Sequence, residues 1–103
     1  MINEKGGGYA RYSDNGVMAE KVNGIVTISI YKTEITAVTT DFETLTTLPE
    51  GFRPYYGHYI TSVTAVGSYL WFFVSPTGAV MIRASANGSY KILGGGICYP
   101  AYS

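Results

Sequence analysis

The chain has 103 residues, which suits one domain and is too short for two. Hydrophobic residues make up 47% and charged residues only 14%, so uncharged polar groups, aromatic rings or other subunits must cover part of the surface. Seven basic residues balance seven acidic ones, and no apolar stretch approaches the roughly 20 residues of a membrane helix, so we expect neither nucleic-acid binding nor membrane insertion.

The start of the chain differs from the rest. It opens with polar residues, unlike a secretory signal peptide, and continues into three glycines at 6–8 that hold no single conformation without support. We therefore predict a linker, or the remnant of a longer protein, at residues 1–8 and a single β-sandwich domain at residues 9–103. The lone cysteine, Cys98, lies in an apolar run and is predicted to be buried, with no disulfide framework in the chain.

From residue 9 onward, strand signals alternate with turn signals, and no segment shows a helical period. Asn23-Gly24 lies between two alternating runs and is the strongest hairpin signal, because both residues tolerate the positive φ of a type I′ turn. Residues 33–42 are rich in threonine and are predicted to form a loop, with room for a short edge strand. The predicted strands are 9–12, 17–22, 25–31, 43–48, 58–66, 69–75, 80–84, 90–93 and 97–102.

Alternation within these strands separates an inward face from an outward face. The segment 69–75 is apolar on both faces, so Tyr69, Trp71 and Phe73 point away from the core and need cover from a second layer or a second subunit. They are our candidates for a subunit interface. The predicted core residues are Val26, Ile28, Ile30, Leu70, Phe72, Val74, Val80, Ile82 and Ala84.

The recurrence of glycine, proline and asparagine between short strands indicates the fold class. It predicts an all-β domain, either an antiparallel β-sandwich or a small jelly-roll-like barrel, with about seven to nine strands. A domain of this size buries only roughly 60–65% of its unfolded surface, so its stability margin is thin unless neighbouring subunits help.

Motifs for catalysis or metal binding are weak throughout the chain. It has one histidine, His58, and one cysteine, which are too few for a usual zinc site. Residues 94–96 are all glycine but lack the lysine and the helix of a phosphate-binding loop, so a bulge before the last strand is expected instead. We predict no catalytic residue, no metal site and no cofactor.

The middle of the chain contains a rigid connection, which we call the LPEGFRP loop (residues 48–54). It follows the strands around Asn23-Gly24 and precedes the apolar strand 69–75 and the glycine turn at Gly78. This order resembles the C-terminal domains of tail, baseplate and tail-fibre proteins from phages and prophages of Gram-positive hosts, over roughly residues 17–102.

The resemblance implies an antiparallel β head, usually a homotrimer, at the tail tip of a virion or phage-like particle. It implies as partners a host cell-wall polysaccharide or other surface glycan, together with other tail or baseplate proteins. The loop is expected to be structural, with Leu48 and Phe52 pinned to the core and Arg53 holding either nearby carbonyl groups or Glu50. The structural residues of the loop are Leu48, Pro49, Gly51, Phe52, Arg53 and Pro54.

The candidate glycan site is the dense aromatic group that follows this loop. Sugars stack their apolar faces on tyrosine and tryptophan, while nearby polar groups take the hydroxyls. We therefore predict ligand contacts from Tyr55, Tyr56 and His58, with Asp41 and Glu43 as polar partners.

Three other functions compete with a glycan-binding head. A structural trimer cap or attachment domain would form the same trimer without glycan affinity. A free-standing lectin-like module would be monomeric or dimeric and would contain an aromatic groove. A small hydrolase would need a buried pair of carboxylates, for which the sequence gives no sign.

Overall fold

The structure is a computed structural model that describes residues 2–5, 8–31, 34–63, 69–91 and 96–102. Within these ranges the chain forms eleven strands: β1 (Ile2–Lys5), β2 (Tyr9–Asp14), β3 (Val17–Val22), β4 (Ile25–Ile30), β5 (Glu34–Val38), β6 (Glu43–Thr47), β7 (His58–Val63), β8 (Tyr69–Val74), β9 (Ala79–Ala84), β10 (Gly88–Lys91) and β11 (Gly96–Pro100). No helix in the described part of the chain is long and apolar enough to cross a membrane.

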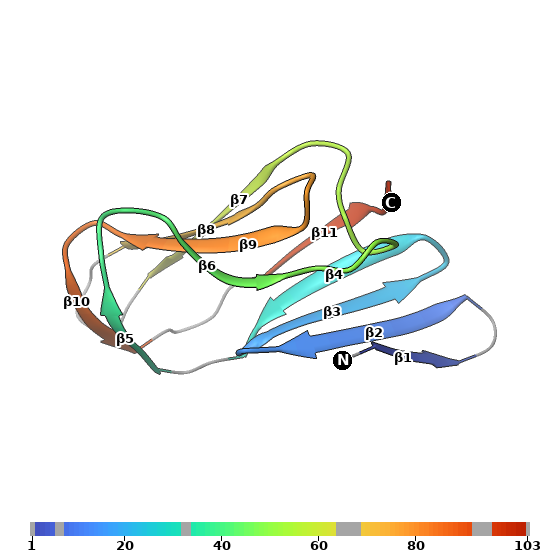
Figure 1. Cartoon of the computed structure of the whole chain (residues 1–103), viewed down its shortest axis with the longest axis horizontal. Helices are drawn as coiled ribbons and strands as arrows, with labels where there is room; N and C mark the ends of the chain where they lie inside the picture. The colour runs from blue at the N-terminus through green and yellow to red at the C-terminus, as the bar shows by residue number, and fades with distance from the viewer. Residues whose placement is uncertain (1, 6–7, 32–33, 64–68, 92–95, 103) are drawn as a thin grey trace.

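The strands form three antiparallel sheets (Figure 1). A five-stranded sheet has the order β1-β2-β3-β4-β11, and a four-stranded sheet has the order β6-β9-β8-β7. The two larger sheets lie as layers of a sandwich, and the two-stranded sheet β10-β5 lies at one end of it. The prediction of an all-β, antiparallel sandwich is confirmed, with more strands than the expected seven to nine.

The core fills the space between the two larger sheets. Alternate residues of β4, β8 and β9 are buried, as their apolar periodicity predicted. Every residue of the predicted core set is at most 7% exposed, and Phe72 is the largest of the fully buried side chains. Burial of these side chains is the main force that holds the layers together.

The hairpin between β3 and β4 has the geometry that its sequence predicted. Asn23 has a φ of 50° and Gly24 a φ of 83°, the pair of left-handed conformations that a type I′ turn needs. Asn15 and Gly16 repeat this pattern between β2 and β3, with φ angles of 47° and 81°. Two turns of one type therefore fix the register of three neighbouring strands.

Two features of the fold differ from the expectations, the strand at residues 2–5 and the position of Cys98. Residues 2–5, expected in a linker, form the edge strand β1, which pairs with β2 from Ile2↔Tyr12 to Lys5↔Tyr9. Residues 34–38 form β5, a short strand for which the predicted threonine-rich loop left room, and pair with β10. In both segments the pairing partner decides the structure, and sequence periodicity does not reveal it.

Cys98 is exposed, so the prediction of a buried thiol is wrong. In β11 the neighbouring Tyr99 takes the inward position and is 3% exposed, which turns Cys98 to the outside because strand residues alternate. The ends of two predicted strands, at 64–66 and 92–93, lie outside the described residues, as does most of the glycine run at 94–96.

The LPEGFRP loop is anchored to the core at both ends. Leu48 and Phe52 are at most 2% exposed. The Arg53 Nε donates a hydrogen bond to the Leu48 carbonyl at 2.9 Å, and the Leu48 N–H donates to the Gly78 carbonyl at 2.8 Å. The Tyr99 hydroxyl donates to the Phe52 carbonyl at 2.5 Å. The loop therefore ties the four-stranded sheet to β11 of the five-stranded sheet.

Candidate functional site

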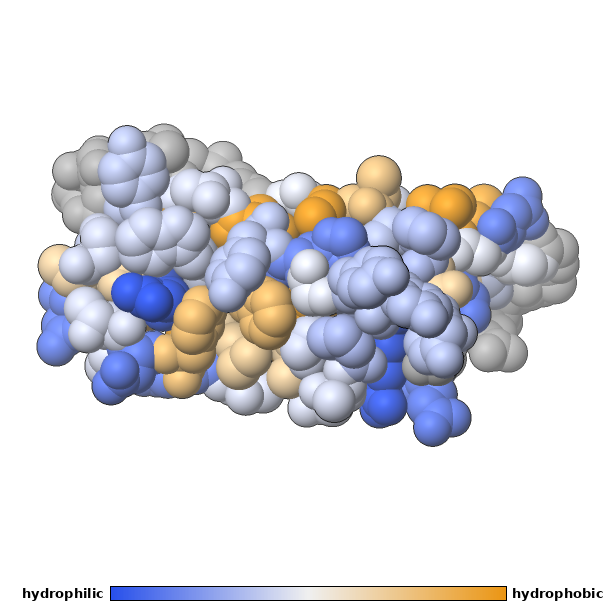
Figure 2. All heavy atoms as spheres, turned by 90° about the horizontal axis from the view of Figure 1, so that it is seen from above, coloured by the Kyte–Doolittle hydropathy of each residue, from blue (hydrophilic) through white to orange (hydrophobic). Residues whose placement is uncertain are grey.

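The outer face of the four-stranded sheet presents aromatic side chains. Its register places Thr61, Trp71 and Arg83 opposite one another on β7, β8 and β9, and aligns Tyr59 with Phe73 in the same way. Figure 2 shows the molecule from the side on which this sheet lies in Figure 1, where apolar, pale aromatic and blue hydrophilic residues adjoin one another.

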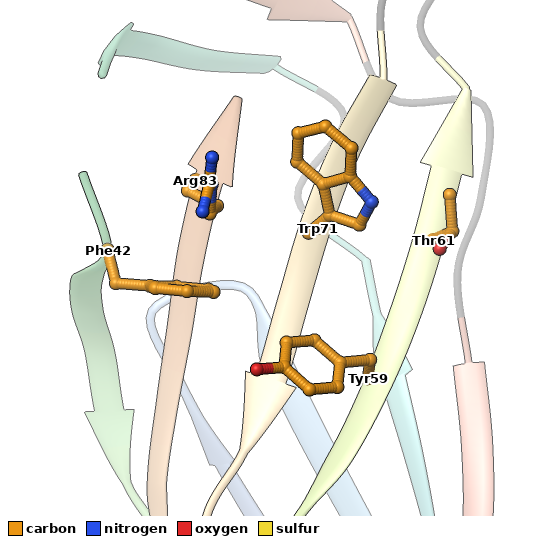
Figure 3. A pocket seen from close by; sticks show the side chains of 5 residues that line it. All are labelled: Phe42, Tyr59, Thr61, Trp71 and Arg83. Carbon is orange, nitrogen blue, oxygen red and sulfur yellow. The ribbon is translucent and has the colours of Figure 1, made fainter. Parts of the chain in front are cut away.

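A hollow of about 380 Å³ opens on this face. It is lined by Phe42, Tyr59, Thr61, Trp71 and Arg83 (Figure 3). Four of these side chains come from three adjacent strands, and Phe42 stands just before β6 on the far side of β9. The lining thus combines aromatic rings with two hydroxyl groups and one guanidinium group.

Arg83 lies between two of the rings (Figure 3). Its Cζ atom is 5.2 Å from the centre of the Trp71 ring and 5.4 Å from that of Phe42. Both distances fall within the roughly 6 Å over which a cation is attracted to an aromatic face. The Arg83 Nε is buried and has no hydrogen-bond partner among the described residues. The two rings therefore position the guanidinium at the hollow.

The floor of the hollow is supported by packed rings. The Tyr59 ring centre is 4.7 Å from that of Phe73, and the Phe42 ring centre is 6.2 Å from that of Phe73. A Cβ atom at Gly57 would lie 2.6 Å from the Phe73 ring, so the absence of a side chain there is what lets the ring lie over the backbone. Gly57 thus sets where Phe73 and its two aromatic neighbours sit.

The tyrosines predicted from sequence form a second aromatic group, which we call the tyrosine cluster (Tyr55, Tyr56 and Tyr102). The Tyr55 ring centre is 4.8 Å from that of Tyr56 and 4.4 Å from that of Tyr102. All three side chains are more than half exposed. Tyr102 is far from the other two tyrosines in the sequence. Its backbone N–H donates a hydrogen bond to the Arg53 carbonyl at 2.7 Å, which brings its ring beside Tyr55.

His58 lies apart from the tyrosine cluster in its contacts. Its ring stacks on Tyr99 at 5.4 Å with an interplanar angle of 7°, which joins β7 to β11. Burial of the Tyr99 side chain raises the pKa of its hydroxyl well above the ordinary range, because the charged phenolate is disfavoured away from water. Both side chains therefore serve the junction of the two sheets.

Asp41 and Glu43 flank Phe42 at the edge of the four-stranded sheet. Both are exposed, and the Thr39 hydroxyl donates to the Glu43 carboxylate at 3.4 Å. No contact among the described residues joins either carboxylate to Tyr55, Tyr56 or His58. The described residues also contain no group of three or more histidine, cysteine or acidic side chains placed to hold a metal ion.

Sequence analysis selected none of the five residues around the hollow as ligand contacts. Trp71 was singled out as an interface candidate, while Tyr59, Thr61 and Arg83 were noted as strand residues or not at all. The signal that could have found them is the outward position of each in an alternating strand. Phe42 gave no such signal, because only the packing of its segment against Phe73 brings it to the hollow.

Comparison with known proteins leaves the resemblance of the LPEGFRP loop as a prediction from the sequence. A scan against protein-family models found no match, and a search of the curated proteins found none either.

Proposed function

We propose that this chain is a non-catalytic domain of a phage tail or baseplate protein that binds a host cell-surface glycan in the hollow on its four-stranded sheet. The observation that supports the proposal is the lining of that hollow, in which Trp71 and Tyr59 stand beside the Thr61 hydroxyl and the Arg83 guanidinium. Its volume of about 380 Å³ is at the small end of the roughly 300–1,000 Å³ usual for ligand sites, which suits a short segment of a saccharide.

The chemistry of this lining matches that of a sugar. Each sugar ring has an apolar C–H face that packs on an aromatic ring, and hydroxyls around its edge that need hydrogen-bond partners. Trp71 and Tyr59 offer the rings, while Thr61, the Tyr59 phenol and Arg83 offer donors. These are groups that hold a saccharide, whereas hydrolysis of one requires a pair of carboxylates across the cleft.

The assignment to a phage particle is supported by the sequence of the LPEGFRP loop and the strands around it. Many copies on one particle would raise the avidity of a weak site, since linked sites bind at a high effective concentration. A shallow, small hollow is therefore compatible with firm attachment to a cell wall.

A second candidate function is a structural trimer cap or attachment domain. It is favoured by the aromatic character of the same face, on which Tyr69 is 51% exposed and stacks on Trp71 with ring centres 6.4 Å apart. Association through this face would cover the hollow and bury Trp71 between subunits, whereas glycan binding requires Trp71 to be open to the ligand.

Binding to purified Gram-positive cell-wall fragments tests the proposal, with the solution mass measured by light scattering in parallel. We expect the wild type to bind and Trp71→Ala to lose at least about tenfold in affinity, the cost of removing a central aromatic anchor. Tyr56→Ala is the matched control, because it removes an exposed ring from the tyrosine cluster and leaves the hollow intact.

The opposite results would separate the alternatives. Loss of wall binding in Tyr56→Ala alone would move the site to the tyrosine cluster. A wild type that binds no wall fragment, and whose oligomer dissociates in Trp71→Ala, would overturn glycan binding and favour the structural cap. A monomer that binds walls through Trp71 would point to the lectin-like module.

A further inference from the structure

We propose that the ligand in the hollow carries an anionic group, a carboxylate or a phosphate, which pairs with Arg83. This inference rests on the proposed glycan binding and narrows it to acidic saccharides. It depends on the way in which the guanidinium is held and on the donors that this arrangement leaves free.

Two aromatic rings of the lining hold the guanidinium in place. Its Cζ atom lies over the Trp71 and Phe42 rings, 5.2 and 5.4 Å from their centres. The N–H donors of a guanidinium lie in its plane and point outward from its edge. A ligand that enters the hollow therefore meets donors in a fixed plane, which is the geometry that a carboxylate or a phosphate matches with two parallel hydrogen bonds.

The described residues supply neither an acceptor for the buried Arg83 Nε nor an ion-pair partner for this cation. The ion pair recorded among them, between Lys91 and Glu34, lies on exposed side chains elsewhere. Arg83 is half-buried, lines the hollow and has no ion pair with a described residue. An anionic group of a ligand in the hollow would supply the missing countercharge.

The nearby carboxylates do not fill this role. Asp41 and Glu43 stand on either side of Phe42, yet neither makes an ion pair or a hydrogen bond with Arg83 in the part of the chain that the structure describes. The Glu43 carboxylate instead accepts a hydrogen bond from the Thr39 hydroxyl at 3.4 Å. Arg83 thus stays open to a ligand.

Competition on cell-wall fragments tests this inference in the full chain. The probes are a short oligouronate, a short polyol-phosphate oligomer and a neutral oligosaccharide of the same length. We expect at least one anionic probe to displace the wild type at a concentration at least about tenfold lower than the neutral probe, and higher salt to weaken that displacement. Displacement by the oligouronate alone or by the phosphate oligomer alone would identify the source of the charge.

Two variants of Arg83 sharpen the test. Arg83→Gln keeps most of the stem and should lose the preference for anionic probes, whereas Arg83→Lys keeps the charge without the planar fork and should retain part of it. Their thermal unfolding, compared with that of the wild type, shows whether each variant is folded. The salt dependence of the wild type gives a readout that needs no variant.

The failures of the two proposals are distinguishable. Equal displacement by all three probes, or by none of them, in a wild type that binds walls would overturn the anionic ligand and leave glycan binding in place. Unchanged preference in a folded Arg83→Gln would also overturn it. Absence of wall binding by the wild type would overturn both proposals together.

Discussion

The two large sheets bury similar apolar side chains toward each other, but their outer faces differ. Across the five-stranded sheet, one row of paired positions contains Arg11, Glu20, Thr27 and Cys98. The corresponding row on the four-stranded sheet contains Trp71 between a threonine and an arginine. A stable sandwich requires only that the inner residues be apolar, so the first outer face shows what the fold alone demands. The outer face of the four-stranded sheet is aromatic although the fold does not require it, and this is why we assign that face a function.

The largest expected effect compares neighbouring residues on opposite faces of β8. Phe72 is fully buried, so Phe72→Ala should lower the free energy of unfolding by about 3–5 kcal/mol. Phe73 lies on the outer face, so Phe73→Ala should cost about 1–2 kcal/mol. Urea unfolding monitored by circular dichroism measures both. If Phe73→Ala costs as much as Phe72→Ala, the outer face is packed like a core, which would favour cover by another subunit.

A second prediction concerns the contact between the Gly78 turn and the start of the LPEGFRP loop. Gly78 has a φ of 93°, and a Cβ atom there would lie 2.5 Å from the Leu48 carbonyl oxygen. Gly78→Ala should therefore cost about 2–4 kcal/mol, from left-handed strain together with a backbone clash.

Gly24→Ala is the matched control for Gly78→Ala. Gly24 has a φ of 83° but no atom within 4 Å of its missing Cβ, so strain alone should cost about 1–2 kcal/mol. Equal losses in the two variants, measured by urea unfolding, would show that the backbone clash with Leu48 is relieved without cost.

The smallest expected effect concerns the pH dependence of the free energy of unfolding. It tests the junction of the two sheets at Tyr99. Burial raises the pKa of Tyr99 above its ordinary value of 10.0, so above that pH the unfolded chain releases the proton before the folded chain does. The stabilising contribution is complete below pH 10 and declines as the pH rises above it, by at most about 1.4 kcal/mol per pH unit. Tyr99→Phe should flatten this decline in urea unfolding measured from pH 9 to 11.

Tyr9→Phe is the control for that profile. Tyr9 is exposed to solvent at its hydroxyl, and its pKa is raised by the hydrogen bond to Glu20 on the outer face of the five-stranded sheet. We expect its removal to change the alkaline profile less than Tyr99→Phe does, because solvent screens exposed groups. A larger change in Tyr9→Phe would show that the inter-sheet hydrogen bond of Tyr99 is not what alkaline pH disrupts.

The local periodicity of the sequence determined most of the fold. Alternation in β4, β8 and β9 identified the inward residues, because a strand buried on one face needs apolar side chains at every second position. The Asn23-Gly24 pair identified its hairpin, because few other residues adopt two successive positive φ angles. These features depend on neighbours in the chain, and a sequence displays such neighbours directly.

The tertiary structure decided which outer residues meet. The sequence singled out the crowded tyrosines after the LPEGFRP loop, since proximity along the chain was the available measure of clustering. The hollow instead combines Phe42, Tyr59 and Thr61 with Trp71 and Arg83, which come from four segments that pairing and sheet order bring together. Pairing with β10, far along the chain, also fixed residues 34–38 as a strand. Such long-range partners are set by the packing of the whole sandwich, so no local pattern contains them.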